Sequence, residues 1–594
     1  MITSKHFFCA ALILICSFSP IARTKQHTPP VTFVHPQPQT MIDRNDLEIV
    51  VGFDSPIDTL SVDAHSFSVF GRWTGVCAGK VLFEENRHQV RFIPQKTISA
   101  GEWVTVTLSK NILSASGQPM STGYSWNFWT KAEVGRLEFT ETQVIPVRRA
   151  GESGIRTYGA YAGDLNGDGF HDFTVPNEDA SDIRIFLNDG AGHYRDFSIY
   201  QLAGNVKPST NEGADFNGDG LIDFAVGNIN GNSVTVFEGS GSGLLVNART
   251  YSAGRGTRGL TVLDLNGDGA TDIVTANRAS SNISLLLNMG DGTFQRSQYM
   301  EAGVGSETSC ASADANEDGL LDVYIGGFDS QEIAVLLSDG NGNLAKKSKA
   351  DAGGAAWMIA VGDVDNDGHV DVVSANGPQN HFSVLRGDGQ GNLRPAEIYP
   401  TGVFPLAIDL GDLDGDGDLD VVTSNFDSAD WTLYENDGSG RFVNPQTLQA
   451  RRAGSCAVLH DRDQDGDLDI TGIDELDDLL FLFTNSHTTA VKNTHPQTLP
   501  TKIALLQSYP NPFIKSNQIL NTEVTLPFRL ETAARVRIEL FNLKGQRLDV
   551  LINHQMSAGY HAPKWSVHHL PVGMYFYRIS TAKTSQIKKL LLLP

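Results

Sequence analysis

One nine-residue pattern occurs seven times along the chain, beginning at residues 164, 215, 264, 314, 363, 412 and 461. Successive copies start 49 to 51 residues apart, which indicates a structural repeat. In the third copy, DLNGDGATD (264–272), oxygen-bearing side chains occupy positions one, three, five and nine, and glycine occupies position six. A polar turn explains one such segment, but it does not explain seven with the same four positions filled.

The spacing of the oxygen-bearing residues suits a bound Ca²⁺ ion. Calcium takes about 6–8 oxygen ligands from a tightly curled loop, and glycine permits the sharp turn. Position seven varies, as expected if only its carbonyl is used, whereas the constant Asp at position nine suits bidentate closure. Without a cation the carboxylates of one loop would repel each other. We therefore predict about seven calcium ions, with these ligands: Asp164, Asn166, Asp168 and Asp172; Asp215, Asn217, Asp219 and Asp223; Asp264, Asn266, Asp268 and Asp272; Asp314, Asn316, Asp318 and Asp322; Asp363, Asp365, Asp367 and Asp371; Asp412, Asp414, Asp416 and Asp420; Asp461, Asp463, Asp465 and Asp469.

Short apolar segments surround each loop. One leads in, one leaves, a third ends in a glycine-rich turn such as NDGAGHY (188–194), and a fourth runs to the next repeat. Four antiparallel strands in every repeat are typical of a propeller blade, so the chain predicts an all-β, seven-bladed β-propeller over 135–486. The seventh repeat ends with LLFLFTN (479–485) and lacks an outer strand. The unassigned segment RLEFTETQVIPV (136–147) is predicted to supply it and so to remove an exposed sheet edge.

The loops and their flanking strands resemble the FG-GAP/VCBS repeats of integrin α-subunits and of many bacterial surface proteins. The resemblance covers roughly residues 135–486 and implies a calcium-binding propeller with a role in adhesion.

Two N-terminal segments precede the repeats. Residues 1–22 combine Lys5 with an apolar run (7–18) and are predicted to be a secretory signal, too short to span a membrane. Residues 30–131 are predicted to form a small β-sandwich from segments such as LEIVVGF (47–53) and EWVTVTLS (102–109). Together with YSWNFWT (124–130), they resemble the bacterial Ig-like domain. Deletion of 30–131 is expected to be tolerated by the propeller.

A second small β-sandwich is predicted at the C-terminal end. Residues 487–504 have the polar, Thr- and Pro-bearing composition of a linker. In 505–594, the segments YPNPF, NLKGQ, GMYFYRI and the final KKLLLL resemble, in order, the C-terminal sorting domain of type IX secretion substrates. The resemblance implies a Gram-negative cell, passage through the periplasm, contact with the type IX machinery, and release from the cell or attachment to its surface.

Composition excludes several functions. The formal net charge is −24, and much of the acidity lies in the seven loops, where calcium would offset it. Nucleic-acid binding is disfavoured because phosphate contact needs clustered Lys and Arg. Three cysteines outside the signal, Cys77, Cys310 and Cys456, make no disulfide framework. No serine-hydrolase elbow, zinc-protease motif or P-loop is present, so no catalytic residue is predicted.

The end of the propeller opposite the calcium loops is the predicted ligand face. It holds the turns between second and third strands and the crossovers between repeats, and variable loops on a rigid scaffold suit recognition. Ordinary turn chemistry explains any one of these residues equally well. The candidates are Arg156, Tyr158, Asn177, Asn228, Arg255, Arg258, Asn277, Arg278, Phe328, Trp357, Asn376, Phe404, Asn425, Phe426 and Trp431.

Three functions remain open: a surface propeller that binds a protein or glycan ligand, a lyase-like polysaccharide-processing enzyme, and a structural surface component. The tripeptide Arg386-Gly387-Asp388 invites an integrin-ligand interpretation, but it falls where other repeats have a turn, which favours chance.

Overall fold

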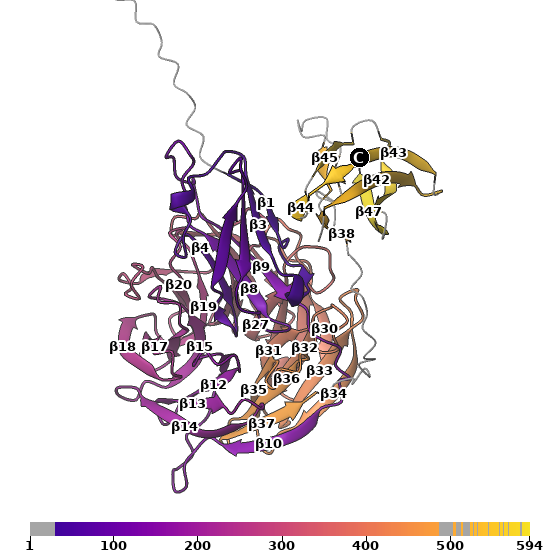
Figure 1. Ribbon diagram of the computed structural model, residues 1–594. Coiled ribbons are helices and arrows are strands. Elements are labelled where there is room, and N and C mark those ends of the chain that lie inside the picture. Colours follow the sequence, from indigo (N-terminus) through magenta and orange to yellow (C-terminus); the bar gives the residue numbers. More distant parts are fainter. Residues whose placement is uncertain are drawn as a thin grey trace, which may run out of the picture. The chain divides into compact units, whose positions relative to one another are not determined.

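Strands dominate the part of the chain that the structure covers. The computed structural model describes residues 30–485 and, between 503 and 593, the strands of a C-terminal unit with most of their connections. The signal segment 1–22 and most of the linker lie outside the described residues. Other regular elements in the described ranges are the short 3-10 helices η1 (Arg44–Asp46), η2 (Thr59–Ser61) and η3 (Gly377–Gln379). The chain divides near residue 488 into two units (Figure 1). The all-β prediction is confirmed.

The N-terminal segment folds into the predicted sandwich of two sheets. In β8, Val104 and Val106 are fully buried and alternate with half-buried Trp103 and Thr105, because successive side chains of a strand point to opposite faces. The first sheet has the order β1 (Val31–His35), β3 (Ile49–Phe53), β7 (Gln89–Pro94) and β6 (Gly79–Phe83). The second has the order β2 (Met41–Ile42), β9 (Tyr124–Thr130), β8 (Trp103–Leu108), β4 (Phe67–Gly71) and β5 (Gly75–Val76).

The repeats form seven antiparallel four-stranded sheets in the described residues. Six of them are consecutive in sequence. They comprise β11 (Tyr161–Gly163), β12 (Asp172–Asn177), β13 (Asp182–Asn188) and β14 (Tyr194–Gln201); β15 (Pro208–Ala214), β16 (Asp223–Asn228), β17 (Ser233–Gly239) and β18 (Leu245–Ser252); β19 (Thr257–Leu263), β20 (Asp272–Asn277), β21 (Asn282–Leu286) and β22 (Gln298–Met300); β23 (Glu307–Ala313), β24 (Asp322–Gly327), β25 (Glu332–Ser338) and β26 (Leu344–Asp351); β27 (Ala356–Gly362), β28 (Asp371–Asn376), β29 (His381–Leu385) and β30 (Glu397–Pro400); β31 (Pro405–Gly411), β32 (Asp420–Asn425), β33 (Asp430–Asn436) and β34 (Phe442–Gln449). The seventh comprises β35 (Gly454–His460), β36 (Asp469–Asp474), β37 (Leu479–Thr484) and β10 (Thr140–Pro146).

These sheets form a ring. The innermost strands β11, β15, β19, β23, β27, β31 and β35 contact one another in succession, and β11 contacts β35. Figure 1 shows them around a common centre. Second strands such as β20 (DIVTAN) are buried along their whole length because strands flank them on both sides. Outer strands are polar: β26 (LAKKSKAD) exposes lysines, which discourages pairing with another chain.

The seventh sheet is completed by a strand that precedes the first repeat, as predicted. β10 pairs antiparallel with β37, with Val144 opposite Phe481 and Ile145 opposite Leu480. Ile145 and Val147 are buried in the same apolar cluster as Phe481. The strand covers 140–146 of the predicted 136–147.

Among the described residues of the C-terminal unit, the strands form two sheets and one strand pair. Val536, Ile538 and Tyr577 are fully buried and form its apolar core with neighbouring strands. No helix in the described ranges is long and apolar enough to cross a membrane. The sheets have the orders β38 (Ile503–Leu505), β41 (Phe528–Leu530), β44 (Gly559–His561); β39 (Phe513–Ile514), β47 (Ser585–Leu593), β46 (Gly573–Ser580), β42 (Ala534–Asn542), β43 (Arg547–Met556); and β40 (Glu523–Thr525), β45 (Lys564–Ser566).

Replacing the buried closing residue, Ile145→Asp, should weaken the ring. An unpaired charge would enter an apolar cluster, and we expect a loss of about 3 kcal/mol or more, seen as a lower Tm in thermal unfolding. Glu141→Gln, at an exposed position of the same strand, is the control and should leave Tm within about a degree. Equal Tm values for the two variants would contradict a structural role for β10.

Candidate functional site

Each nine-residue loop joins the first and second strands of one sheet and curls through a fixed backbone conformation. Glycine at position six has φ between 84° and 103° in all seven copies, as the sequence predicted. Position four also has positive φ in every copy, including the non-glycine residues Glu317, Asn366 and Gln464. Such φ values are uncommon in residues other than glycine. The left-handed conformation at position four is therefore a second backbone constraint on the loop, and the sequence pattern did not predict it.

Carboxylates hold the loop by accepting amide hydrogens. In the third loop, Asp264 Oδ1 accepts from Gly267 N at 2.8 Å, and Asp264 Oδ2 accepts from Gly269 N at 2.8 Å. Asn266 Oδ1 accepts from Asp268 N at 2.9 Å, and Asp268 Oδ1 accepts from Ala270 N at 2.9 Å. Positions one, three and five therefore turn their oxygens toward the interior of the loop.

The Asp at position nine has a structural role in every repeat. One oxygen of Asp272 accepts from Asn288 N at 2.7 Å and the other accepts from Leu265 N at 2.9 Å. The first bond, to the amide sixteen residues further on, occurs in all seven repeats at 2.7–2.9 Å. Each oxygen retains a lone pair that could bind a cation. If the aspartate bound calcium through both oxygens, as expected from the sequence, each oxygen would also keep its hydrogen bond from an amide.

The loops can accommodate a divalent cation. In the fifth, sixth and seventh loops, three carboxylates each offer an oxygen, and these atoms lie within 4.8 Å of one another: Asp363, Asp365 and Asp371; Asp412, Asp414 and Asp420; Asp461, Asp463 and Asp465. Loops one to four have Asn at position three and so carry one negative charge fewer there. Burial and neighbouring carboxylates raise the pKa of Asp412 to about 7 and that of Asp322 to about 8. A bound cation would relieve this cost of holding like charges together.

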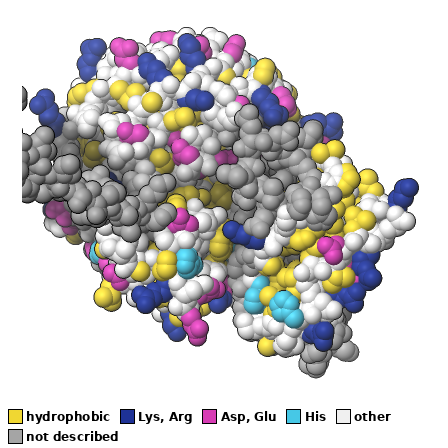
Figure 2. Space-filling model, turned by 90° about the horizontal axis from the view of Figure 1, so that it is seen from above, with side chains coloured by type: hydrophobic (Ala, Val, Ile, Leu, Met, Phe, Trp, Pro, Cys, Tyr) yellow, Lys and Arg dark blue, Asp and Glu magenta, His cyan; other side chains and the backbone are white. Residues whose placement is uncertain are grey.

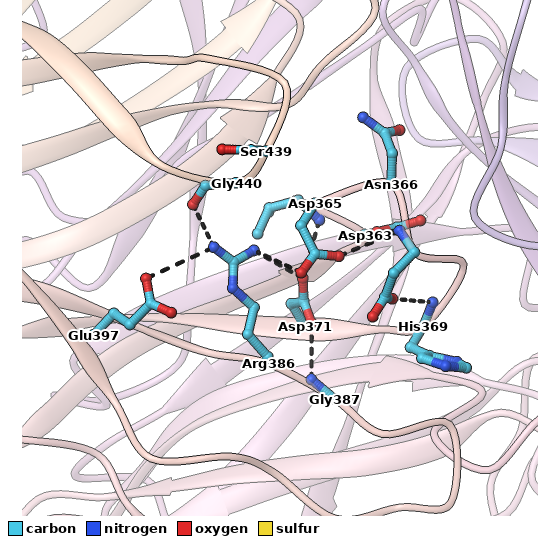
Figure 3. A network of polar contacts seen from close by, with 12 residues as sticks. Asp363, Asp365, Asn366, His369, Asp371, Arg386, Gly387, Glu397, Ser439 and Gly440 are labelled. Carbon is cyan, nitrogen blue, oxygen red and sulfur yellow. Dashed lines mark hydrogen bonds and ion pairs between the residues drawn. The ribbon is translucent and has the colours of Figure 1, made fainter.

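The fifth repeat adds a cation of its own (Figure 3). The Arg386 guanidinium lies 3.3 Å from Asp371 and 3.6 Å from Asp365, and it donates to the carbonyl of Gly440 in the next repeat. Only 6% of Arg386 is exposed, and the Asp388 carboxylate is occupied by nearby amides. The Arg-Gly-Asp tripeptide is therefore part of the fold, in agreement with the chance interpretation.

A recurrent asparagine links neighbouring sheets. This asparagine lies sixteen residues after the ninth position of the loop. Its side-chain amide donates a hydrogen bond to the carbonyl of position two in the loop of the preceding repeat. Asn288, for example, donates to Phe216 O at 2.8 Å. From the sequence, the asparagine of turns such as NDGAGHY (188–194) predicts a turn but not this link between repeats. The residues are Asn188, Asn288, Asn436 and Asn485.

The Ig-like sandwich covers the loop end of the propeller. Main-chain hydrogen bonds join Lys110 N to Gly267 O at 2.8 Å and Ser125 N to Gly319 O at 2.7 Å. At the seventh loop, Arg44 lies 3.7 Å from Asp461, and Glu133 N, just beyond the sandwich, donates to Gly466 O at 2.8 Å. Lys96 also pairs with Asp164, the first residue of the first loop. The sandwich thus contacts at least four loops, a packing that the sequence did not predict.

A cavity of about 240 Å³ lies on the axis of the ring, between the sandwich and the innermost strands. Trp103 and Arg72 from the sandwich line one end, where the Arg72 guanidinium lies 3.0 Å from Asp409. Tyr158 and Trp357 line the cavity from two separate repeats. Cys310 and Cys456 are also in its wall, and burial raises the pKa of the Cys456 thiol to about 12.

Arginines and aromatic rings meet at the predicted ligand face. The Trp357 indole donates to the Tyr158 hydroxyl at 2.9 Å across the ring of sheets. The Arg258 guanidinium lies 4.8 Å from the centre of the Trp357 ring, and that of Arg278 lies 4.9 Å from it. Arg278 also lies 4.5 Å over Phe328. We call Tyr158, Arg258, Arg278, Phe328 and Trp357 the axial cluster.

Charge in the axial cluster is only partly balanced. Glu475 lies 2.7 Å from Arg156, and Glu178 lies 3.6 Å from Arg156 and 3.9 Å from Arg258. Burial raises the pKa of Glu475 to about 7, although Arg156 opposes this effect. Burial and the neighbouring Arg258 lower the pKa of Arg278. An anionic group placed near Arg278 would be stabilised by the positive charges of Arg258 and Arg278.

Several predicted ligand-face residues are structural instead. Trp431 is fully buried in an apolar cluster, and five asparagines that end second strands are fully buried. Asn277, for example, donates to Ser284 at 2.8 Å across the next strand. Arg156 and Arg255 are exposed, whereas Phe404 and Phe426 are half-buried. The buried asparagines are Asn177, Asn228, Asn277, Asn376 and Asn425.

Family comparisons agree with this architecture. The FG-GAP-like repeat profile matches 164–226, 215–275, 264–325, 314–374, 363–423 and 413–471, which together cover more than half of the chain. The chain therefore belongs to the family of FG-GAP-like repeat proteins. Residues 25–130 match a bacterial Ig-like domain, and residues 507–592 match a secretion system C-terminal sorting domain. The protein is accordingly a secreted or cell-surface protein of a Bacteroidetes-type Gram-negative bacterium, and its tail implies the type IX machinery.

Similarity to other proteins is distant. No curated protein matches the chain. An Agrocybe aegerita lectin structure, whose title describes recognition of non-reducing terminal N-acetylglucosamine, is 18% identical with a TM-score of 0.37, and the match covers 64% of this chain and 89% of the lectin. A protein of unknown function from Desulfotomaculum acetoxidans is 12% identical with a TM-score of 0.36, covering 65% and 96%. A Lactobacillus plantarum protein is 15% identical with a TM-score of 0.39, covering 66% and 98%.

Two substitutions in the third loop should separate anchoring from metal binding. Asp272→Ala removes the acceptor of two buried amides, and we expect a loss of about 2–4 kcal/mol even with chelator present. Asp268→Asn keeps an amide acceptor and removes a charge, so it should reduce only the stabilisation by added calcium. Thermal unfolding with calcium and with chelator measures both effects. Identical behaviour of the two variants would contradict the distinction.

Separating the sandwich from the loops should expose the axial cavity. A Cβ added at Gly123 would lie 2.8 Å from Gly267 Cα, so Gly123→Val should wedge the contact apart. We expect at least several-fold faster alkylation of Cys310 and Cys456, followed by mass spectrometry in the presence of calcium. Ser121→Val, at an exposed position, is the matched control. Cys77, buried in the sandwich core, should stay protected; its reaction at the same rate would indicate unfolding of the sandwich instead.

Proposed function

We propose that this protein is a calcium-stabilised propeller that binds a protein or glycan ligand at the cell surface or in the medium. About seven ions would be bound, one in each loop, through the residues at positions one, three, five and nine. The clustered, buried carboxylates with raised pKa values support this proposal. Calcium would supply positive charge that holds each loop in one conformation. The loops would then keep the surface that the Ig-like sandwich contacts in place.

The axial cluster is the observation that carries the ligand proposal. The sandwich contacts the loop end, so the opposite end of the propeller is the surface left for recognition. There, Arg258 and Arg278 lie on aromatic rings at the centre of the ring of sheets. Aromatic residues and arginine are the side chains that most often dominate binding energy at interfaces. Rigid strands beneath the loops hold these groups in position before a ligand arrives.

Electrostatics favour a ligand that brings a negative or strongly polar group. No ion pair joins Arg278 to a carboxylate among the described residues, and its guanidinium is half-buried. A hydrogen bond to such a charged group contributes about 1.5–3 kcal/mol when the partner fits. The cluster therefore has unused binding capacity at the axis, while exposed charges elsewhere on the surface in Figure 2 are of both signs and interspersed.

Binding should depend on Arg278 and on an intact ring. We expect Arg278→Ala to weaken the ligand about 10-fold or more, because truncation of an interface arginine commonly removes over 1.4 kcal/mol. Arg441→Ala, at a glycine turn on the loop end and highly exposed, is the control and should bind normally. Glycan and protein arrays probed with the full chain in calcium give the ligand and both affinities.

The alternatives predict different results on the same material. A polysaccharide-processing enzyme would release new chain ends from a bound polysaccharide, which a reducing-end assay detects. A purely structural component would bind no array ligand. Equal binding by the Arg278→Ala and Arg441→Ala variants would place recognition away from the axial cluster.

A further inference from the structure

The axial cavity is bounded by both parts of the first unit. Asn127 and Trp129 of the sandwich are in its wall together with Thr210 and Ser309 of the innermost strands. At the other end, the Trp357–Tyr158 hydrogen bond spans the axis, beside Arg258. The channel expected through a ring of sheets is therefore a pocket, covered by the sandwich at the loop end and by the Trp357–Tyr158 hydrogen bond at the axial cluster. Clefts at domain interfaces are common ligand sites.

Buried polar atoms in the wall are short of partners. Within the described part of the chain, six polar atoms that belong to residues of the wall, each enclosed by surrounding protein, have no side-chain or main-chain hydrogen-bond partner: Asn127 Oδ1, Trp129 Nε1, Asn211 Oδ1, Arg258 Nε, Ser309 Oγ and Ser455 Oγ. Each would cost about 1–3 kcal/mol if it stayed dry. Groups of this kind in a native protein call for a bound molecule or water. A cavity of 240 Å³ holds about eight waters or one molecule of monosaccharide size.

Aromatic surface accompanies these polar atoms. Trp103 and Trp129 lie edge to face with ring centres 4.7 Å apart, and Trp357 lines the same cavity. A sugar ring presents C–H groups on its faces and hydroxyl groups at its edge. The combination of indole rings with hydroxyl and amide groups matches that chemistry, since few other small molecules need both in equal measure.

Charge inside the pocket selects against an ionic ligand. Arg72 is paired with Asp409 at 3.0 Å, so its charge is already compensated. Glu212 is half-buried in the wall beside them, and desolvation raises the pKa of its carboxyl to about 7, which lowers the cost of its neutral form. A charged guest at the sandwich end of the pocket would therefore lose hydration without gaining a free counter-charge, whereas Arg258 lies at the opposite end.

We propose that the axial pocket binds one neutral sugar residue, the end of a glycan chain, with the Ig-like sandwich as its base. This rests on the proposed ligand-binding function and assigns its ligand class. The Trp357–Tyr158 hydrogen bond must open to admit the sugar, and Arg258 and Arg278 then face the next residue of the glycan.

The test uses the full chain in calcium and follows the two wall cysteines. Glucose, galactose, N-acetylglucosamine and glucuronic acid are the probes. At least one neutral sugar should slow alkylation of Cys310 and Cys456 several-fold in a saturable way, while glucuronic acid should not. Ala360→Leu adds volume to the wall and should weaken this protection at least 10-fold. Ser455→Ala removes one hydroxyl and should weaken it several-fold. Ala191→Leu, at an exposed turn, is the matched control.

Each contrary result has one meaning. No protection by any probe in a chain with native tryptophan fluorescence would show that the pocket holds only water and would overturn the proposal. Better protection by glucuronic acid than by neutral sugars would overturn the ligand class. Array binding that is lost in Arg278→Ala but intact in Ala360→Leu would leave the proposed function standing and exclude the pocket. Absence of both array binding and protection would defeat the two proposals together.

Discussion

The bond between the ninth aspartate of each loop and the amide sixteen residues later underlies the whole repeat. It ties the end of the loop to the end of the third strand in all seven sheets. The second oxygen ties the loop back to its own start, as in Asp272 to Leu265. Asparagines such as Asn288 then carry the connection to the preceding repeat. The aspartate thus joins the loop to its own sheet, and the asparagine joins that sheet to the preceding repeat. A metal ion bound in the loop would reinforce this arrangement.

The conformation of the loops also explains where the N-terminal sandwich contacts the propeller. Curling of the loops turns carbonyl groups such as Gly267 O and Gly319 O outward at one end of the ring, where strand-end amides of the sandwich reach them. Small residues make the approach possible, since Gly123 contacts Gly267 directly. The propeller consequently has two unlike ends: one carries the acidic loops and contacts the sandwich, and the other carries arginine and aromatic side chains.

Periodicity in the sequence was enough to predict the ring, its closing strand and the position of the loops. These features depend on local spacing, such as Asp264 to Asp272, and on strand counting. What the sequence could not show depends on distant contacts. The sandwich meets the loops through main-chain groups, which leave no residue signature at Lys110 or Gly267. Likewise, the Asn of DIVTAN looks the same whether it faces solvent or Ser284, and only packing decided that Asn277 is buried. Tyr158 and Trp357 were singled out as loop residues, but their meeting across the axis needed the closed ring.

The placement of β10 has a consequence for the order in which the protein matures. Thr140 pairs with Thr484, so the closing contact joins segments separated by almost the entire repeat region. Contacts between such distant segments carry a high entropic cost and form late. A chain crossing the inner membrane from its N-terminal end cannot complete the ring until the seventh repeat has emerged, and the sorting tail at 507–592 follows that repeat. Completion of the ring and arrival of the sorting tail are therefore close in time, and the tail that directs the protein onward emerges only after all seven repeats.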